Sequence, residues 1–265
     1  MSEDTPQDTM RHCEGYTSAT DAGQSGCLLE EWFDLLPHLS GVILARHDRP
    51  LVTVSYAQSV DGSIASRNRE QLRLSSHQSM VLTHRIRAAC DAIVIGINTL
   101  LVDDPLLTVR LIKGPSPQPI VLDSKLRIPL QARLLNRTDR RCWLACTDNH
   151  VSERVGEVQS RGAEVIRCRR DLRGMVDLPD VLHKLGRRGI RNIMVEGGSQ
   201  VITSFIKARL VDQMIITIAP CLVGGLPVLD RPAVSNGSLL GFNPISYQSC
   251  GPDIVIWAQP RWQDP

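Results

Sequence analysis

The sequence predicts an α/β protein with a largely parallel central sheet, and two observations support this class. From residue 50 onward, apolar runs rich in β-branched residues alternate with segments of helical periodicity. This alternation is the pattern of βαβ units, whose successive strands run parallel. A stretch rich in Gly, Pro and Ser at 224–252 is expected to be a loop, and the apolar run after it is expected to form an antiparallel C-terminal strand.

The individual elements follow from these runs. The predicted strands are the apolar runs at 51–58, 92–96, 119–123, 142–146, 164–168, 191–195, 213–219 and 253–257. The predicted helices are the periodic segments at 75–89, 150–161, 178–187 and 199–209. Ser75 or Ser76 is expected to cap the first helix, and Pro179 suits the first turn of the third.

The N-terminal region differs from the rest. Residues 1–27 are rich in Ser, Thr, Asp and Gly and are expected to form a flexible tail, too acidic for a signal or transit peptide. Residues 28–39 repeat apolar side chains at helical spacing, and Pro37 ends or kinks that helix. The helix either docks on the main domain or contacts a partner. The predicted organisation is therefore a tail at 1–27, an amphipathic helix and linker at 28–48, and one domain at 49–265.

Composition excludes several classes of protein. The chain has 265 residues, of which 42% are hydrophobic and 22% charged, with a formal net charge of +2. A general nucleic-acid binder usually carries a strong basic excess, which is missing here. No apolar stretch reaches the roughly 18–20 residues of a membrane span. We expect a cytoplasmic protein whose eight cysteines are reduced thiols.

Metal sites are not expected. The run at 12–14 has the HxE form of zinc nucleotide deaminases, but the partner PCxxC motif is missing from the sequence. Cys142 and Cys146 would share one face of a strand, which is typical of core thiols.

Two segments could carry chemistry or could be plain turns. In VEGGSQ at 195–200, Gly197 and Gly198 allow a sharp turn and close approach of a ligand, and the following helix N-terminus suits a phosphate. A tight turn explains this pattern equally well. Asp103 and Asp104, before Pro105, are either a cap and turn or functional carboxylates at the end of a strand.

Three further segments have simpler interpretations. Asp61 and Gly62 form a turn signal, which predicts a hairpin or loop. Arg85 and Arg87 project from a helix about 200° apart, so at most one of them points into a given site. The basic run at 167–173 is expected to be a solvated loop.

Taken in order, four blocks of the sequence resemble the riboflavin-biosynthesis reductase family, over about residues 49–260. The blocks are RPLVTVSYAQSVDGSIA at 49–65, THRIRAACDAIVIGINTLLVDDPLLTVR at 83–110, PIVLDSKLRIP at 119–129 and NIMVEGGSQVITSFIKARLVDQMIITIAPCLVGG at 192–225. Members occur alone or as the C-terminal half of a bifunctional deaminase–reductase. The resemblance implies a dihydrofolate-reductase-like three-layer α/β sandwich, a homodimer and NADPH as cofactor.

The resemblance also implies a reaction. A phosphoribosylamino-pyrimidine, either 5-amino-6-(5-phosphoribosylamino)uracil or its 2,5-diamino-pyrimidinone counterpart, would be reduced from ribosyl to ribityl. The sugar opens to an imine, and hydride adds at its first carbon. The motifs do not distinguish the two substrates, and Asp103, Glu196 or a water could protonate the imine.

The resemblance assigns roles residue by residue. The expected cofactor contacts are Ala57, Thr99, Asp103, Ser124, Gly197, Gly198, Ser199, Gln200 and Val201, with Lys125 neutralising the adenosine 2′-phosphate. The expected substrate contacts are Gln71, Arg87, Leu107, Arg110 and Glu196, with the two arginines on the phosphate. Asp103 and Glu196 are the expected catalytic residues.

The chain departs from the family at two places. Ser55 stands where many bifunctional members carry a Lys in the first strand, so a mechanism that depends on this lysine is in doubt. Gln71 and Arg73 stand where those members place Ser and Trp.

The sequence leaves two alternatives to the riboflavin-pathway reductase. A paralogue could reduce another substrate such as dihydrofolate, but dihydrofolate reductases lack the DDP-x-LTV-R block and a pterin has no 5′-phosphate. A non-catalytic NADPH-binding protein could recruit a partner through its N-terminal helix. Only the extension at 1–48 supports that alternative.

Overall fold

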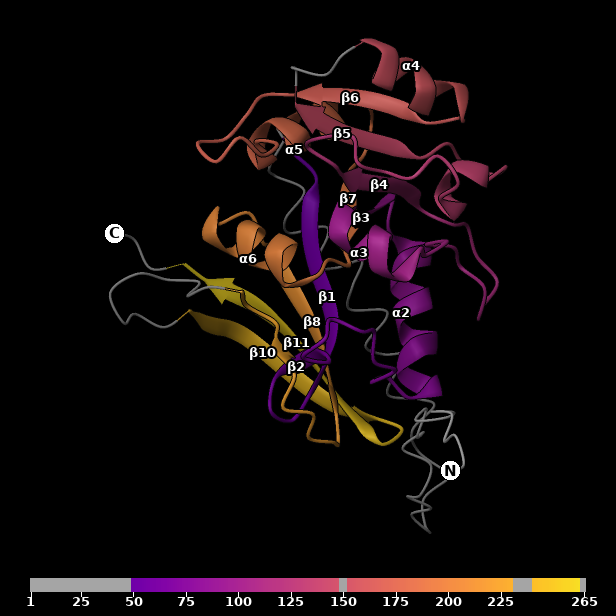
Figure 1. Cartoon of the computed structure of the whole chain (residues 1–265). Helices are drawn as coiled ribbons and strands as arrows, with labels where there is room; N and C mark the ends of the chain where they lie inside the picture. Colours follow the sequence, from indigo (N-terminus) through magenta and orange to yellow (C-terminus); the bar gives the residue numbers. More distant parts are fainter. Residues whose placement is uncertain (1–48, 148–151, 231–239, 263–265) are drawn as a thin grey trace, which may run out of the picture.

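A computed structural model describes residues 49–147, 152–230 and 240–262 (Figure 1). The tail at 1–27 and the helix and linker at 28–48, both expected from the sequence, lie outside the described residues. A nine-stranded sheet runs through the described part in the order β10-β11-β8-β1-β7-β3-β4-β5-β6. Its strands are β1 Leu51–Ser59, β3 Ala92–Gly96, β4 Gln118–Leu122, β5 Trp143–Thr147, β6 Glu164–Cys168, β7 Asn192–Val195, β8 Gln213–Ala219, β10 Gly241–Cys250 and β11 Asp253–Arg261.

The direction of the strands confirms the predicted fold class. Strands β1 and β3 to β8 run parallel to their neighbours among themselves. Strand β11 is antiparallel to β8, and β10 is antiparallel to β11. The expected antiparallel C-terminal strand is therefore confirmed, although it belongs to a pair.

The helices lie on both faces of the sheet and make three layers (Figure 1). They are α2 His77–Ala89, α3 Ile97–Asp103, α4 Ser152–Ser160, α5 Leu178–Arg187 and α6 Ser199–Lys207, with a 3-10 turn at Arg133–Asn136. Ser76 caps α2 by accepting the N–H of Ser79, and Pro179 lies in the first turn of α5. Both features agree with the sequence prediction.

Alternating side chains of each strand supply two separate cores. On one face, Val94 of β3 packs in a cluster with Leu185 of α5 and Phe205 of α6. On the other face, Ile93 and Ile95 of the same strand pack with residues of α3 and α4. On that second face, Leu82 and Ile86 of helix α2 pack against side chains of β7, β8 and β11. Because successive side chains of a strand point to opposite faces, one sheet can pack against a layer of helices on each side.

Strands β9 and β10 and helix α3 were not predicted from the sequence. The segment 224–252 was expected to be a loop, but it contains β10 and the short strand β9 Leu226–Pro227. Gly241 and Pro244 have low strand propensity, so the sequence did not predict β10. Proline is tolerated there because β10 is an edge strand with an irregularity between Phe242 and Ile245. Helix α3 was also missed, since it has only seven residues.

The expected turn at Asp61 is confirmed, with Gly62 at a φ of 79°. The Asp61 carboxylate accepts hydrogen bonds from the hydroxyls of Ser59 and Ser63 at 2.6 and 2.7 Å. It also accepts the N–H groups of Val223 and Gly224 at 2.9 and 2.8 Å. These four bonds lower the pKa of Asp61 far below its usual range. Asp61 thus ties the turn after β1 to the segment before β9, which is a structural role.

Candidate functional site

A cleft of about 1730 Å³ opens at the carboxyl ends of the parallel strands. Strands β1, β7, β3 and β4 are neighbours in the sheet, and each ends at this cleft. Ligands of open α/β sheets bind at this edge, because loops and helix N-termini converge there. Nearly all the site residues expected from the sequence line the cleft, namely Ala57, Gln71, Arg87, Thr99, Asp103, Leu107, Arg110, Ser124, Glu196, Gly197, Gly198, Ser199, Gln200 and Val201.

The glycine turn between β7 and α6 is packed too closely for larger residues. A Cβ on Gly197 would lie 2.7 Å from Cβ of Val201. A Cβ on Gly198 would lie 3.2 Å from Oγ1 of Thr99, which accepts the N–H of Gly198 at 3.1 Å. Gly198 is also the N-cap residue of α6 and offers no side chain to cap it. The N–H groups of Gly198 and Val201 already bond to Thr99 and to the Gly198 carbonyl, so Ser199 and Gln200 are the residues of the first turn whose N–H groups can bind an anion in the cleft.

Helix α3 runs beside this turn and carries two of the expected residues. Thr99 and Asp103 are four positions apart and so share one face of the helix. Gly96 was not predicted as a site residue. It is the last residue of β3, and a Cβ there would lie 2.6 Å from Cγ2 of Val201. A small residue is therefore needed on both sides of Val201 to seat α6 against the strand ends.

The two acids after α3 have different environments, which resolves the alternatives for them. Asp104 is the C-cap of α3 with a φ of 37°, and its Oδ1 accepts the N–H of Arg133 at 2.9 Å. Asp104 therefore forms a cap and turn. Asp103 lines the cleft, and burial raises the pKa of its carboxyl above the usual range.

Arg87 and Glu196 form a two-point ion pair inside the cleft. Nε and Nη2 of Arg87 donate to Oε1 and Oε2 of Glu196 at 2.6 and 2.5 Å. Nη1 of Arg87 donates to the carbonyl of Thr108 at 3.2 Å. The pair joins α2, the glycine turn and the segment after α3, which are far apart in sequence. Such paired geometry fixes the direction of both side chains.

The pairing leaves part of the Arg87 guanidinium available. A guanidinium carries five N–H groups, and the hydrogen bonds to Glu196 and Thr108 use three of them. Arg110 is exposed and lines the same cleft. Arg85 is not among the cleft residues, so only one arginine of α2 points inward, as the helix geometry predicts.

The rim near α3 contains a chain of polar contacts that the sequence did not reveal. Nη2 of Arg127 donates to Oδ1 of Asn98 at 2.8 Å, and Nδ2 of Asn98 donates to Oε1 of Gln200 at 2.9 Å. Arg127 lines the cleft, whereas the exposed Lys125 does not. The intervening Leu126 is buried with a φ of 50°, so alternation along a strand cannot predict which of the two cations faces the cleft.

The far end of the cleft is formed by the basic loop and by Ser124. The loop was expected to be solvated, and Leu172 and Arg173 are exposed, but both also line the cleft. The hydroxyl of Ser124 accepts the N–H of Val176 at 2.9 Å and so anchors this loop beside β4. The proximity of 171–173 to the strand ends was not visible in the sequence.

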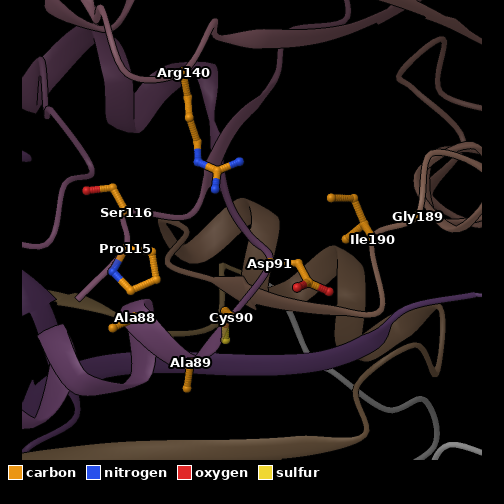
Figure 2. Close-up of a pocket in the computed structure, with 9 residues that line it drawn as sticks. All are labelled: Ala88, Ala89, Cys90, Asp91, Pro115, Ser116, Arg140, Gly189 and Ile190. Atoms are coloured by element: carbon orange, nitrogen blue, oxygen red, sulfur yellow. The ribbon is translucent and has the colours of Figure 1, made fainter.

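A second cavity of about 250 Å³ lies at the start of β3, at the opposite edge of the sheet (Figure 2). Its Asp91 carboxylate already accepts the N–H groups of Arg191 and Asn192 at 2.7 and 3.1 Å. Burial, with Asp91 adding to the effect, raises the pKa of the Cys90 thiol to about 12, so this thiol is not a nucleophile at neutral pH. The larger cleft is therefore the candidate site.

Among the residues the structure describes, no cluster of His, Cys, Asp or Glu could hold a metal ion. Within the same residues, no helix is long and apolar enough to cross a membrane. Cys142 and Cys146 are both buried, as expected of core thiols.

Residues 50–256 match the family described as RibD C-terminal domain. The chain is 39% identical over 199 residues to an Archaeoglobus fulgidus protein named 2,5-diamino-6-ribosylamino-4(3H)-pyrimidinone 5′-phosphate reductase, covering 71% of this chain and 87% of that protein. It is 32% identical over 212 residues to riboflavin biosynthesis protein RibD of Aquifex aeolicus, covering 79% of this chain but only 58% of the relative.

Solved structures agree with this sequence match. The Acinetobacter baumannii RibD structure, form 2, superposes with a TM-score of 0.70 at 22% identity, covering 81% of this chain and 58% of that one. The reductase Rib7 of Saccharomyces cerevisiae superposes with a TM-score of 0.64 at 24% identity, covering 80% of this chain and 90% of that one. The dihydrofolate-reductase-like fold expected from the sequence is thereby confirmed.

Proposed function

This chain belongs to the RibD C-terminal domain family, and from this premise we propose that it is the NADPH-dependent reductase of a phosphoribosylamino-pyrimidine in riboflavin biosynthesis. The observation that carries the proposal is the cleft itself. An uncapped helix N-terminus behind two glycines, an exposed arginine and a carboxyl with a raised pKa all line it. A dinucleotide phosphate, a sugar phosphate and an imine are the groups that these features suit.

The cradle at the glycine turn fits a nicotinamide dinucleotide. A Cβ at Gly197 would meet Val201 and one at Gly198 would meet Thr99, so a larger residue would displace the turn whose backbone would approach the pyrophosphate. The residues 197–201 would hold the pyrophosphate, and Ala57 and Thr99 would lie along the nicotinamide side. When bound, the dinucleotide supplies the hydride that the reduction consumes.

The adenosine 2′-phosphate needs a cation, and two follow Ser124 in the sequence. The resemblance gives this role to Lys125. Arg127 lines the cleft and Lys125 does not, so Arg127 takes the role in this proposal. Its contact with Asn98 holds the guanidinium beside Gln200 at the start of α6.

Replacing Gly197 with alanine should weaken NADPH binding about 10-fold. The added methyl would meet Cβ of Val201 at 2.7 Å and displace the turn, and a loss of about 1.4 kcal/mol in the binding free energy corresponds to this 10-fold change. Titration of the protein's fluorescence with NADPH measures the dissociation constant. Gly156→Ala on α4 is the matched control, because nothing lies within 4 Å of its added methyl. Equal affinity in both variants would argue against pyrophosphate at this turn.

On the substrate side, Arg110 and the two remaining N–H groups of Arg87 would bind the 5′-phosphate. Leu107 would offer its backbone, Gln71 would contact the pyrimidine end, and Glu196, held by Arg87, would face the substrate. Reduction turns the C=N bond of the opened sugar imine into a C–N single bond. Hydride is added at carbon, and a proton is added at nitrogen. Asp103 is the proposed proton donor, because the Glu196 carboxylate is already committed to Arg87.

The relatives favour the undeaminated substrate. Three proteins at 35–39% identity carry the name of a 2,5-diamino-pyrimidinone phosphate reductase, and the RibD proteins match at lower identity. We therefore propose the diamino-pyrimidinone as the preferred substrate. Comparison of kcat/KM for the two pyrimidines tests this preference, and mass analysis identifies the product, because reduction adds two hydrogen atoms and leaves the 2-amino group in place.

The proposal includes a homodimer. Ile245 and Tyr247 of β10 and Ile254 of β11 are 54, 76 and 46% exposed. The strand register puts Ile254 beside Ile218, and Tyr247 beside Ile256, on the face that α6 covers further along the sheet. Among the described residues, no helix covers these three side chains. Such an apolar patch on an edge strand suits a second copy of the chain.

Tyr247→Asp should shift the protein toward monomers, because a dimer axis at this patch would bring two buried carboxylates together. Sedimentation equilibrium over a range of concentrations measures the shift. Leu222→Asp is the control, since Leu222 is 78% exposed but lies outside the patch. A dimer that survives Tyr247→Asp unchanged would place the interface elsewhere.

A further inference from the structure

The segment 104–110 supplies Leu107 and Arg110 to the cleft without being a helix or a strand. Leu107 is buried with a φ of 54°, a conformation that side chains other than Gly rarely adopt. Bonds from flanking elements hold the segment in place. These bonds join Asp104 to the Arg133 N–H, Leu106 to Arg137, Thr108 to Arg87, Val109 to Ser116, and Arg110 to His84.

His84 makes the last of these bonds. It lies on α2, three positions before Arg87, and is fully buried. Its Nδ1 accepts the backbone N–H of Arg110 at 3.0 Å. An imidazole that accepts at Nδ1 carries its proton on Nε2, and that atom has no partner among the described residues. A buried unpaired N–H destabilises a fold, so the bond to Arg110 is the polar contact that distinguishes histidine from leucine here.

The charges around His84 keep it in the accepting form. Burial first, and then the positive charges of Arg87 and Arg110, lower the pKa of His84 to about 4, against the opposing charge of Glu196. The imidazole is therefore neutral at the pH of the cell. Protonation would put an N–H where Arg110 needs an acceptor, and would add a third positive charge beside the two arginines.

We propose that His84 is a positioning residue for the substrate phosphate. By accepting the N–H of Arg110, it fixes the backbone from which the Arg110 guanidinium enters the cleft. Arg87, on the same helix, fixes Thr108 two residues earlier. Helix α2 thus sets the position of the phosphate-binding segment through two neighbouring side chains. This inference rests on the proposed function, in which Arg110 binds the phosphate.

The kinetic test compares His84→Leu with His84→Asn. Leucine fills the space but accepts no hydrogen bond, whereas the amide oxygen of asparagine can take the place of Nδ1. We expect His84→Leu to raise KM for the phosphorylated substrate about 3- to 10-fold, the effect of one lost hydrogen bond, with kcat within about twofold. His84→Asn should restore most of the KM.

A matched control separates positioning from folding. Leu82 lies on the same helix, packs in the core cluster and is absent from the cleft lining. Leu82→Ala should lower the melting temperature and leave KM unchanged. If His84→Asn fails to restore KM, or if Leu82→Ala raises KM as much as His84→Leu does, the positioning role is wrong.

Hydrogen exchange makes the test independent of turnover. The Arg110 amide should be protected in the wild type and in His84→Asn, and should exchange faster in His84→Leu. If the wild type does not reduce the phosphorylated pyrimidine, the proposed function fails, while the exchange data still decide the His84 bond. If the wild type is active and the Arg110 amide exchanges equally in all three proteins, the inference fails and the proposed function stands.

Discussion

Replacing Arg110 with alanine is expected to raise KM for the phosphorylated substrate about 100-fold. A guanidinium bound to a phosphate by two charge-assisted hydrogen bonds contributes about 3 kcal/mol, which corresponds to about two orders of magnitude in affinity. Arg110 is the better of the two arginines for this experiment. Removal of Arg87 would also leave Glu196 without its ion-pair partner, and that loss would confuse the result.

Steady-state kinetics with saturating NADPH measure the effect, and the chain offers a close control. Lys113 lies three residues further along, is exposed and does not line the cleft. Lys113→Ala should leave KM within about twofold of wild type, as surface substitutions usually do. A KM that Arg110→Ala leaves unchanged would remove Arg110 from the phosphate site.

Replacing Asp103 with asparagine is expected to lower kcat about 100-fold or more while NADPH still binds. Proton donation by a positioned acid contributes at least about this factor. Burial raises the pKa of Asp103, so its carboxyl keeps a proton to higher pH than an exposed aspartate does. Donation requires the protonated form, and kcat should therefore fall as the pH rises through this raised pKa. That limb of the pH profile should disappear in Asp103→Asn.

Asp104→Asn is the matched control for this prediction. Asp104 is the neighbouring acid, but it caps α3 with a positive φ that asparagine also tolerates, and it does not line the cleft. The Asp104→Asn variant should keep nearly all of the wild-type kcat. A full kcat and an unchanged pH profile in Asp103→Asn would assign the proton to another group or to water.

Hydrophobic runs made most of the sheet predictable. Strands β3 and β8 are mostly apolar segments whose side chains are almost all buried on both faces, and their bounds agree with the prediction. Strand β10 was missed because an exposed edge strand alternates weakly and tolerates proline. Helix α3 was missed because seven residues cannot show a helical period.

The candidate site was also predicted only in part. Motifs placed Asp103, Arg110 and the glycine turn at the cleft, because short blocks of sequence carry them. Contacts between segments that are far apart in the chain could not be predicted, because no short sequence motif indicates them. The pairing of Arg87 with Glu196 spans 109 positions. The bond between His84 and Arg110 likewise depends on how α2 packs beside the segment after α3.

In the proposed function, the protein reduces a phosphoribosylamino-pyrimidine in this cleft with NADPH. The most direct test follows the absorbance of NADPH with the diamino-pyrimidinone phosphate and its deaminated uracil counterpart side by side. We expect oxidation of NADPH with the diamino substrate at the higher kcat/KM, and a product that has gained two hydrogen atoms. Tight NADPH binding without turnover of either compound would contradict the claim and favour a paralogue with another substrate or a non-catalytic protein.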